Sequence, residues 1–258
     1  MGDPLPGYDH DPFRDGEIEH DVRRSGSGPA VLVIHELPGI DDATGMVAER
    51  IRDEGFTVVL PDLLPPMRGK PSGMDLALNF GRICVSNEFW AFALRYDRPV
   101  TRWLQALAVR EHARSGGPGI GIVGMCLSGG FALAAATRAP ISVAIAAEPS
   151  LPFRWRPGAA RDLGMSTAEI RTLRDRAARG EVCVRAFRYG GDPVSPPERL
   201  ARIKELLGGE TVVEPIAGRD HPVLDRAVGM TRHGPGEPDP NAVPALTETL
   251  RVLRETLL

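Results

Sequence analysis

Several features that mark whole classes of protein are missing from this 258-residue sequence. Its three cysteines (Cys84, Cys126 and Cys183) are too few, and odd in number, for a disulfide framework, which favours a reducing setting. No apolar stretch reaches the roughly 18 residues that span a membrane. The polar opening residues 1–15 also lack the apolar core of a signal peptide. We therefore expect a cytoplasmic protein with no membrane partner.

An excess of charge of one sign is also lacking. The 31 Lys and Arg residues nearly balance the 34 Asp and Glu residues, so the net charge is −3. Without a run of basic residues, the sequence argues against a nucleic-acid partner. It contains no repeat, low-complexity tract or linker. We therefore expect a single domain over 1–258, in which residues 1–28 form a polar segment and an edge strand.

What the sequence does contain is an alternation of strand and helix patterns. Apolar runs bounded by Gly or Pro are typical of strands buried on both faces, and they occupy 30–34, 56–60, 120–123, 143–147 and 182–187, with a further strand expected over 211–216. Helical patterns occupy 42–54, 87–114 (interrupted at Pro99), a stretch ending near Arg138, 166–179, 196–207 and 241–258. Such repeated units predict an α/β fold, a mostly parallel sheet with helices on both faces, whose functional residues follow the carboxyl ends of the strands.

The turn after the strand 120–123 carries the first candidate. Residues 124–130 read G-M-C-L-S-G-G, which matches the nucleophile elbow of α/β-hydrolases with Cys126 in place of serine. The small residues Gly124 and Ser128, on either side of Cys126, let the backbone pass closely, and the Leu127 N–H is aimed at a developing oxyanion. The helix that follows is expected to favour the Cys126 thiolate.

Three other interpretations of this segment compete with the elbow. Cys126 could be a small core residue, as most free cysteines are. Ser128 could be the nucleophile, although no glycine lies two residues before it and it falls in the first helical turn. The glycines 119, 121 and 124 spell G-x-G-x-x-G. Because they lie within the strand and do not open a helix, we discount dinucleotide binding.

An acid and a base follow Cys126 in the chain order that hydrolases of this fold use. Asp192 ends the turn Gly190-Gly191-Asp192 after the strand 182–187, where a carboxylate can orient a histidine. Its alternative role is a helix cap or an Asx turn. His221 lies in the turn after the last expected strand, whereas His233, in a Gly/Pro loop, is a weaker candidate.

Glu36 is a further candidate because it places a carboxylate directly after the apolar strand 30–34. A solvated loop acid is the alternative interpretation of such a residue. The same loop would supply a second oxyanion donor, the Leu37 N–H. His35 and Glu36 do not begin a zinc-binding H-E-x-x-H motif, because Gly39 stands where the second histidine is needed. No other cluster has metal-ligand spacing, so no metal is expected.

In order and spacing, these segments resemble the dienelactone hydrolase family over about residues 28–235. The resemblance rests on residues 31–39, 124–130 and 190–192 and on His221. It implies an α/β-hydrolase fold with Cys126 as the nucleophile, Asp192 as the acid and His221 as the base.

The resemblance also assigns roles to the residues around this triad. It implies that the Leu37 and Leu127 amides form the oxyanion hole and that Glu36 takes the thiol proton when substrate displaces it. Members of the family hold a substrate carboxylate with arginines, one of them four residues after the catalytic histidine, where this chain has Asp225. The residues that we expect to contact substrate instead are Arg82 (or Arg95), Arg219, Arg226 and Trp155.

We therefore expect a carboxylic ester or lactone hydrolase that resembles dienelactone hydrolase (carboxymethylenebutenolidase) and needs no cofactor. Cys126 would attack a small ester or lactone, with Glu36 or His221 accepting its proton. One alternative is a catalytically vestigial hydrolase fold that serves as a binding module. Another is a redox-sensing thiol, for which Cys183 would have to resolve an oxidised Cys126. The expected partner is the small substrate, and the chain is expected to be a monomer or homodimer.

Overall fold

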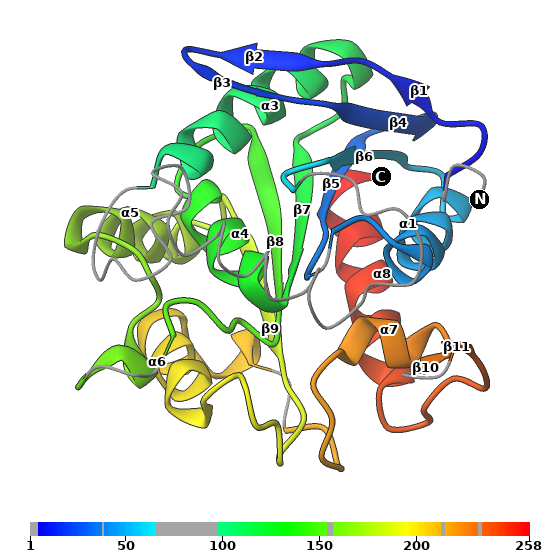
Figure 1. Cartoon of the computed structure of the whole chain (residues 1–258). Helices are drawn as coiled ribbons and strands as arrows, with labels where there is room; N and C mark the ends of the chain where they lie inside the picture. The colour runs from blue at the N-terminus through cyan, green and yellow to red at the C-terminus, as the bar shows by residue number, and fades with distance from the viewer. Residues whose placement is uncertain (1–4, 38, 65–97, 154–156, 213–214, 232–233) are drawn as a thin grey trace.

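The computed structural model of the chain describes residues 5–37, 39–64, 98–153, 157–212, 215–231 and 234–258 (Figure 1). Its main feature is a seven-stranded sheet with the strand order β1-β4-β6-β5-β7-β8-β9. These strands are β1 (Asp9–His10), β4 (Val22–Gly26), β5 (Ala30–Ile34), β6 (Thr57–Pro61), β7 (Ile120–Met125), β8 (Ile141–Ala147) and β9 (Cys183–Phe187). The strands from β6 to β9 in this order pair in parallel, whereas β4 and β1 run antiparallel at the edge. The mostly parallel sheet expected from the sequence is confirmed.

Helices cover both faces of this sheet (Figure 1). The described helices are α1 (Asp42–Asp53), α3 (Pro99–Ser115), α4 (Gly129–Ala135), α5 (Thr167–Ala178), α6 (Pro197–Leu207), α7 (Val223–Ala227) and α8 (Val243–Leu257). The described 3-10 turns are η1 (Cys126–Ser128), η2 (Ala159–Arg161) and η3 (Gly209–Thr211). Two small antiparallel ribbons pair β2 (Phe13–Asp15) with β3 (Ile18–His20), and β10 (Met230–Thr231) with β11 (Gly234–Pro235). Among these helices, none is long and apolar enough to cross a membrane.

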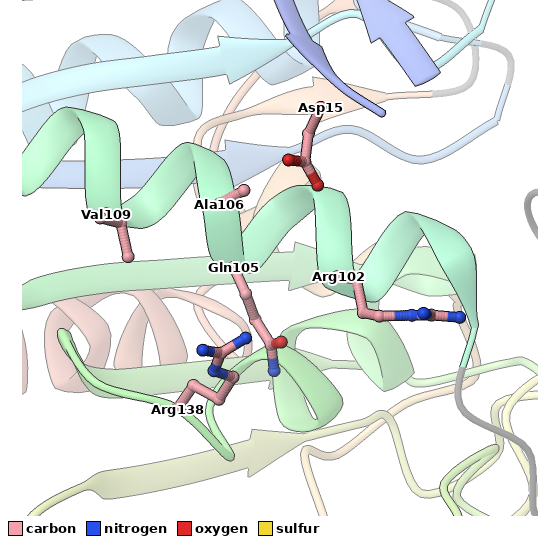
Figure 2. A pocket seen from close by; sticks show the side chains of 6 residues that line it. All are labelled: Asp15, Arg102, Gln105, Ala106, Val109 and Arg138. Atoms are coloured by element: carbon pink, nitrogen blue, oxygen red, sulfur yellow. The ribbon is translucent and has the colours of Figure 1, made fainter. Parts of the chain in front are cut away.

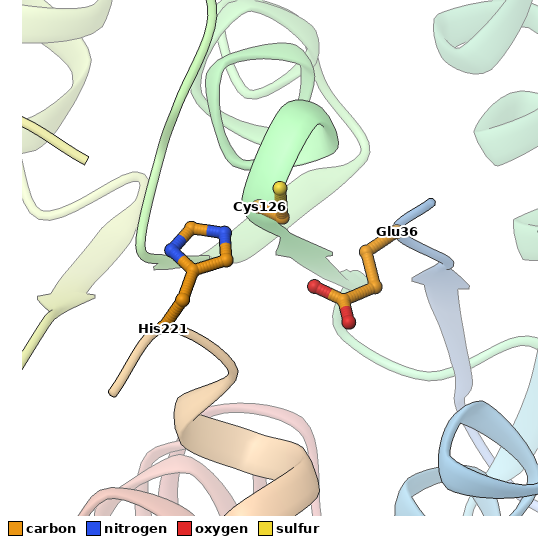
Figure 3. Close-up of side chains that lie close together, drawn as sticks. All are labelled: Glu36, Cys126 and His221. Carbon is orange, nitrogen blue, oxygen red and sulfur yellow. The ribbon is translucent and has the colours of Figure 1, made fainter. Parts of the chain in front are cut away.

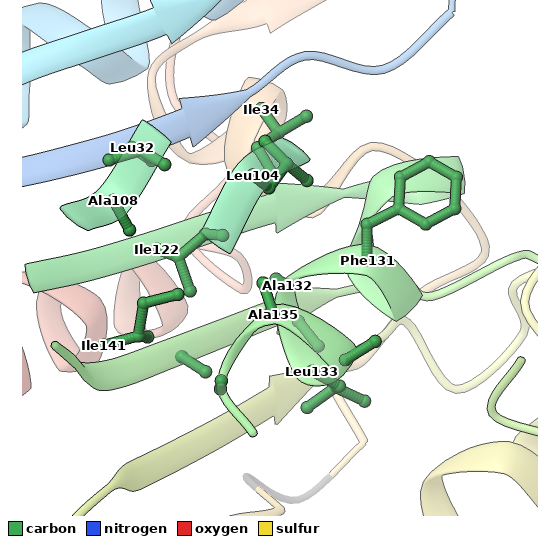
Figure 4. Packing of buried hydrophobic residues seen from close by; sticks show 14 of the residues in the cluster. Leu32, Ile34, Leu104, Ala108, Ile122, Phe131, Ala132, Leu133, Ala135 and Ile141 are labelled. Atoms are coloured by element: carbon green, nitrogen blue, oxygen red, sulfur yellow. The ribbon is translucent and has the colours of Figure 1, made fainter. Parts of the chain in front are cut away.

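The central strands are apolar throughout because both of their faces are covered. On β5, the side chains of Leu32 and Ile34 pack into the cluster that contains residues of α3 and α4 (Figure 4). Val31 and Val33, which point to the opposite face, pack with residues of α1 and α8. Successive side chains of a strand alternate between its faces, so one run of apolar residues fills both cores.

Local signals in the sequence place the ends of the first helix. The Asp41 side chain accepts a hydrogen bond from the Thr44 N–H (2.9 Å) and so caps the N-terminus of α1, as expected for this residue type. After the helix, Gly55 adopts a φ of 94°, a left-handed conformation that glycine takes at little cost. The chain can then turn directly into β6.

The expected strand over 211–216 is not a regular strand in the described part of the chain. Thr211 ends the turn η3, and the remaining contacts are isolated bridges of Val212 with Ala186 and of Ile216 with Tyr189. Residues 213 and 214, between the two bridges, lie outside the described residues, and Ile216 exchanges backbone hydrogen bonds with Arg188 and Gly190. The segment nevertheless follows the edge strand β9 and leads to the turn that carries His221.

The N-terminal segment is less polar in the fold than its sequence predicts. Leu5 and Tyr8 are buried against the core layer that contains α1 and α8. Phe13 of the β2–β3 ribbon packs on Trp103 of α3, with the ring centroids 5.4 Å apart. The expected helical residues 87–97 lie outside the described residues, and α3 begins at Pro99, where the proline needs no hydrogen-bonded N–H.

Candidate active site

Three side chains from distant parts of the sequence converge at the carboxyl edge of the sheet. Glu36 follows β5, Cys126 follows β7 and His221 precedes α7. Their carboxylate oxygen, sulfur and ring nitrogen all lie within 4.8 Å of one another (Figure 3). Adjacent parallel strands end at the same edge, so residues that follow them become neighbours in space.

The turn at Cys126 has the strained geometry of a nucleophile elbow. Cys126 adopts a φ of 52°, which a residue with a side chain rarely takes. The turn is tight because a Cβ atom at Gly124 would lie only 2.3 Å from the Ser128 carbonyl oxygen. Glycine at position 124 is therefore required, and the sulfur is carried at the tip of the turn.

Ser128, the rival nucleophile, braces this turn from inside. Its side chain is fully buried, and its Oγ accepts a hydrogen bond from the Met125 N–H at 2.8 Å. The hydroxyl also lies 2.9 Å from the Ile34 carbonyl oxygen, to which it can donate. These bonds join the elbow to β5, and they favour a structural role for Ser128.

Asp192 and His221 form a hydrogen-bonded pair beside the elbow. The Nδ1 atom of His221 lies 2.9 and 3.1 Å from the two carboxylate oxygens of Asp192. Asp192 is held in turn by the Val194 and Ser195 N–H groups, at 2.7 and 3.1 Å. An Nδ1–H donated to this acid leaves the Nε2 lone pair as the acceptor. The His221 Nε2 atom is buried and has no hydrogen-bond partner within the described chain.

The Cys126 thiol is buried, and its environment opposes ionisation. Burial and the charges of Glu36 and Glu148 raise the pKa of the thiol well above its usual range. Hydrogen bonds from the Ser150 hydroxyl, 3.3 Å from the sulfur, and from the Leu127 N–H act in the opposite direction but are outweighed. The sequence-based expectation of a favoured thiolate is therefore wrong. The loss of water on burial raises the pKa of the thiol by more than the short turn and helix after Cys126 can lower it.

Glu148 is a site residue that sequence reasoning missed. It is the first polar residue after the apolar strand β8, it is buried, and it adopts a φ of 37°. Its Oε1 atom accepts a hydrogen bond from the Val223 N–H (3.1 Å), so it holds the start of α7 close to His221. Burial and Asp225 and Asp192 raise its pKa well above the usual range. The signal was the same one that identified Glu36, a lone acid directly after a buried strand.

The Glu36 carboxyl group meets a second acid across the site. It forms a side-chain hydrogen bond with Asp225 of α7. Burial is the main reason why the pKa of Glu36 lies well above its usual range and that of Asp225 is raised to about 6. Glutamate, cysteine and histidine can also bind metals, but the sharp turn under Cys126 is a feature of a nucleophile and not of a metal ligand.

The expected oxyanion donors follow the strand ends in the way the elbow requires. Leu127 belongs to η1, and its N–H donates a hydrogen bond to the Cys126 side chain. Leu37 directly follows Glu36 and is partly buried against the core. The order of these residues along the chain is the one that the fold uses for its two oxyanion amides.

The structure gives different surroundings to the residues that were expected to contact substrate. Arg226 is buried, and its guanidinium binds the Asp220 carboxylate and the Met230 carbonyl oxygen, both at 2.7 Å. These bonds favour a role in holding the His221 loop in place, rather than the expected contact with substrate. Arg219 is exposed and lies against Gly191, at the turn before His221. Arg82, Arg95 and Trp155 lie outside the described residues.

A surface pocket of about 380 Å³ lies over α3, apart from these residues (Figure 2). Its lining consists of Asp15, Arg102, Gln105, Ala106, Val109 and Arg138. None of these belongs to the group around Cys126, so the pocket adds nothing to the candidate site.

Comparisons with known proteins agree with this fold. The model of the "Dienelactone hydrolase family" matches residues 21–154, which include Glu36 and Cys126 but not Asp192 or His221. A solved structure from Klebsiella pneumoniae, assigned as a dienelactone hydrolase, is 14% identical with a TM-score of 0.63 over 96% of both chains.

Two further solved structures come from metagenomic libraries. A dienelactone hydrolase-like promiscuous phosphotriesterase is 17% identical, with a TM-score of 0.62 over 97% of this chain and 98% of that one. A cold-adapted esterase from an Arctic intertidal library is 14% identical, with a TM-score of 0.61 over 96% of this chain and 93% of that one. At these identities the likeness shows the α/β-hydrolase fold. A search of curated proteins found no match.

Proposed function

The chain belongs to the dienelactone hydrolase family, and on that basis we propose that it hydrolyses small carboxylic esters or lactones with Cys126 as the nucleophile. The observation that carries the proposal is the position of the Cys126 sulfur at the tip of a turn with a φ of 52°, within 4.8 Å of a ring nitrogen of His221. The His221 ring is bound to Asp192 through its other nitrogen. A nucleophile, a base and a group that orients the base are the parts that acyl transfer needs.

In the proposed reaction, the Cys126 sulfur attacks the carbonyl carbon of the substrate. The Leu37 and Leu127 N–H groups then stabilise the tetrahedral oxyanion, a contribution worth about 10²–10³ in rate for a single donor. His221 donates a proton to the leaving oxygen and afterwards activates the water that cleaves the thioester. The tetrahedral intermediate goes forward only if it expels the leaving group of the substrate faster than it expels the Cys126 thiolate. A phenol or alcohol oxygen leaves more readily than an amide nitrogen, so esters and lactones suit this site better than amides.

Removal of the thiol tests the proposal directly. We expect Cys126→Ala to lower kcat/KM for p-nitrophenyl acetate and for a small lactone by about 10³-fold or more, because the covalent step is lost. The matched control is Cys183→Ala, which removes the half-buried thiol of β9 and should leave turnover within about twofold.

A variant at the rival hydroxyl completes the test. Ser128→Ala leaves the Met125 N–H without its buried partner and should cost about 1–3 kcal/mol of stability. It should nevertheless retain measurable turnover. Full turnover in Cys126→Ala, or its loss in Ser128→Ala together with a folded protein, would overturn Cys126 as the nucleophile. A well-folded wild type without any ester or lactone turnover would favour the vestigial binding module.

A further inference from the structure

The candidate site brings together a thiol, an imidazole and a carboxyl group, the three kinds of side chain that bind zinc in proteins. Cys126, His221 and Glu36 point toward a common space from three separate segments of the chain (Figure 3). Because their sulfur, ring nitrogen and carboxylate oxygen all lie within 4.8 Å of one another, one point lies within about 2.8 Å of all three, and zinc bonds are about 2.0–2.3 Å long. Side-chain movements of less than about 1 Å would bring all three atoms to bonding distance.

His221 is already oriented in the way that zinc-binding histidines are. Such a histidine almost always donates one ring N–H to a carboxylate or a carbonyl oxygen, which fixes the ring and leaves the other nitrogen for the metal. Here the Nδ1 atom lies 2.9 Å from a carboxylate oxygen of Asp192. The Nε2 atom is buried and has no hydrogen-bond partner within the described chain. The pair therefore presents a free nitrogen toward Cys126 before any metal enters.

The charges around the thiol favour a divalent cation. The carboxyl groups of Glu36 and Glu148 act on the Cys126 sulfur, and Asp192 lies behind the His221 ring. A thiolate alone would add another negative charge to this group, whereas zinc brings two positive charges. As zinc binds the sulfur, it displaces the thiol proton, which passes to solvent. An ion can enter from solvent, since the His221 side chain is 15% exposed and Glu36 is partly exposed.

We propose that Zn²⁺ binds to Cys126, His221 and Glu36 and reversibly inhibits the enzyme. The inhibition rests on the proposed function, because zinc occupies the sulfur that attacks the substrate and the ring nitrogen that handles its protons. The nucleophile elbow thus makes the metal a competitor of the substrate and not a cofactor. Three protein ligands leave the fourth position of the zinc tetrahedron to water. Mg²⁺ prefers oxygen ligands, so it should not bind here.

Metal binding can be measured without any substrate. The full chain, freed of metal with EDTA and dialysed, is titrated with CoCl₂, because sulfur bound to Co²⁺ gives a charge-transfer absorption in the near ultraviolet. Zinc then displaces the cobalt, and the zinc Kd follows from the competition. We expect this absorption to saturate at one metal ion per chain and the zinc Kd to be about 10 µM or tighter. Weaker binding, or no sulfur-to-cobalt absorption, overturns the proposal.

Variants identify the ligands. Cys126→Ala should abolish the sulfur-to-cobalt absorption, and His221→Ala and Glu36→Gln should each weaken zinc binding about tenfold or more. Asp192→Asn keeps all three ligands but alters the acceptor of the ring N–H, so we expect a loss of about 10–100-fold. Cys183→Ala removes a half-buried thiol elsewhere in the sheet and is the matched control, with a Kd within about twofold of wild type. Absorption that persists in Cys126→Ala, or unchanged affinity in His221→Ala or Glu36→Gln, would contradict this ligand set.

Turnover tests whether the bound metal inhibits. With free zinc at about ten times its Kd, we expect kcat/KM for p-nitrophenyl acetate to fall about tenfold, EDTA to restore it and Mg²⁺ to leave it unchanged. Turnover that rises with zinc, or that is unaffected at saturation, would overturn the inhibition. If Cys126→Ala retained full turnover, the proposed function would fail and the inhibitory role with it. The cobalt and zinc titrations would still decide whether the site binds the metal.

Discussion

At the scale of single residues, His35 shows how a buried ring supports the candidate site. It lies directly before Glu36, and its Nδ1 atom is 2.8 Å from the Glu36 carbonyl oxygen, to which it donates. Its Nε2 atom accepts a hydrogen bond from the Leu63 N–H at 3.1 Å. Both nitrogens are used only if the ring is neutral, because a protonated ring has no acceptor. Accordingly, burial lowers the pKa of His35 to about 4.

This lowered pKa predicts how His35 contributes to stability as pH changes. In the unfolded chain a histidine binds a proton below about pH 6.5, whereas in the fold His35 stays neutral down to about pH 4. The unfolded state therefore binds more protons in this interval, and the contribution of His35 is present above pH 6.5 and is lost as the pH falls toward 4. It amounts to about 3 kcal/mol when complete.

The measurement compares wild type with His35→Gln. Free energies of unfolding, obtained by urea denaturation, should differ most at about pH 7 and converge toward about pH 4. Using the difference between the two proteins removes the opposite trend from buried acids whose pKa is raised, such as Glu36 and Glu148. A difference that stays constant over this interval would contradict a neutral, buried His35.

At the scale of elements, one arginine of α6 binds residues that follow β8, close to the elbow. Arg199 is fully buried, and its guanidinium donates to the carbonyl oxygens of Pro149, Pro152, Ala159 and Asp162 at 2.6–2.8 Å. Burial lowers its pKa to about 10, so it remains charged at neutral pH. These bonds fix the chain on either side of Ser150, whose hydroxyl lies 3.3 Å from the Cys126 sulfur.

Replacement of this arginine should loosen the loop. Arg199→Met keeps the aliphatic length but leaves buried carbonyl groups without donors, so we expect unfolding to become easier by about 3–5 kcal/mol. Arg202→Met is the matched control on the same helix, since Arg202 is near the surface and pairs only with Glu205 (3.2 Å) in the described structure. It should change stability by about 0.5 kcal/mol or less. Equal effects of the two variants in urea denaturation would contradict the role given to Arg199.

At the scale of the whole molecule, the packing of the helices on the sheet depends on the close approach of α8 to the central strand β7. A Cβ atom at Gly121 of β7 would lie 2.6 Å from the Leu253 side chain of α8. Glycine at this position lets α8 pack directly on the strand that leads into the elbow. The last helix therefore completes the core layer that also contains α1 and α7.

Two leucines near the C-terminus, one buried and one exposed, test how α8 packs against the sheet. Leu253 is fully buried, whereas Leu258, directly after this helix, is 67% exposed. We expect Leu253→Ala to lower the free energy of unfolding by about 2–5 kcal/mol because it leaves a cavity against β7. Leu258→Ala should change it by about 0.5 kcal/mol or less. Comparable losses in denaturant unfolding would show that α8 is not packed as described.

The sequence determined the central strands, because a strand covered on both faces must be apolar at every position, as residues 30–34 are. It also predicted the elbow, since the close passage of Gly124 and Ser128 demands small residues at fixed spacing from Cys126. Over 211–216, by contrast, the described residues form a 3-10 turn at Thr211 and isolated bridges at Val212 and Ile216 in place of the expected regular strand. In the first two cases the information is local.

Only the tertiary structure decided the electrostatics around the sulfur. The bond between Glu36 and Asp225, the contact of Glu148 with the start of α7 and the raised pKa of Cys126 all depend on which distant segments meet and on how much water they exclude. A pattern of residue types carries the order of nucleophile, acid and base. It does not carry distances or burial, and these set the charge that each group bears.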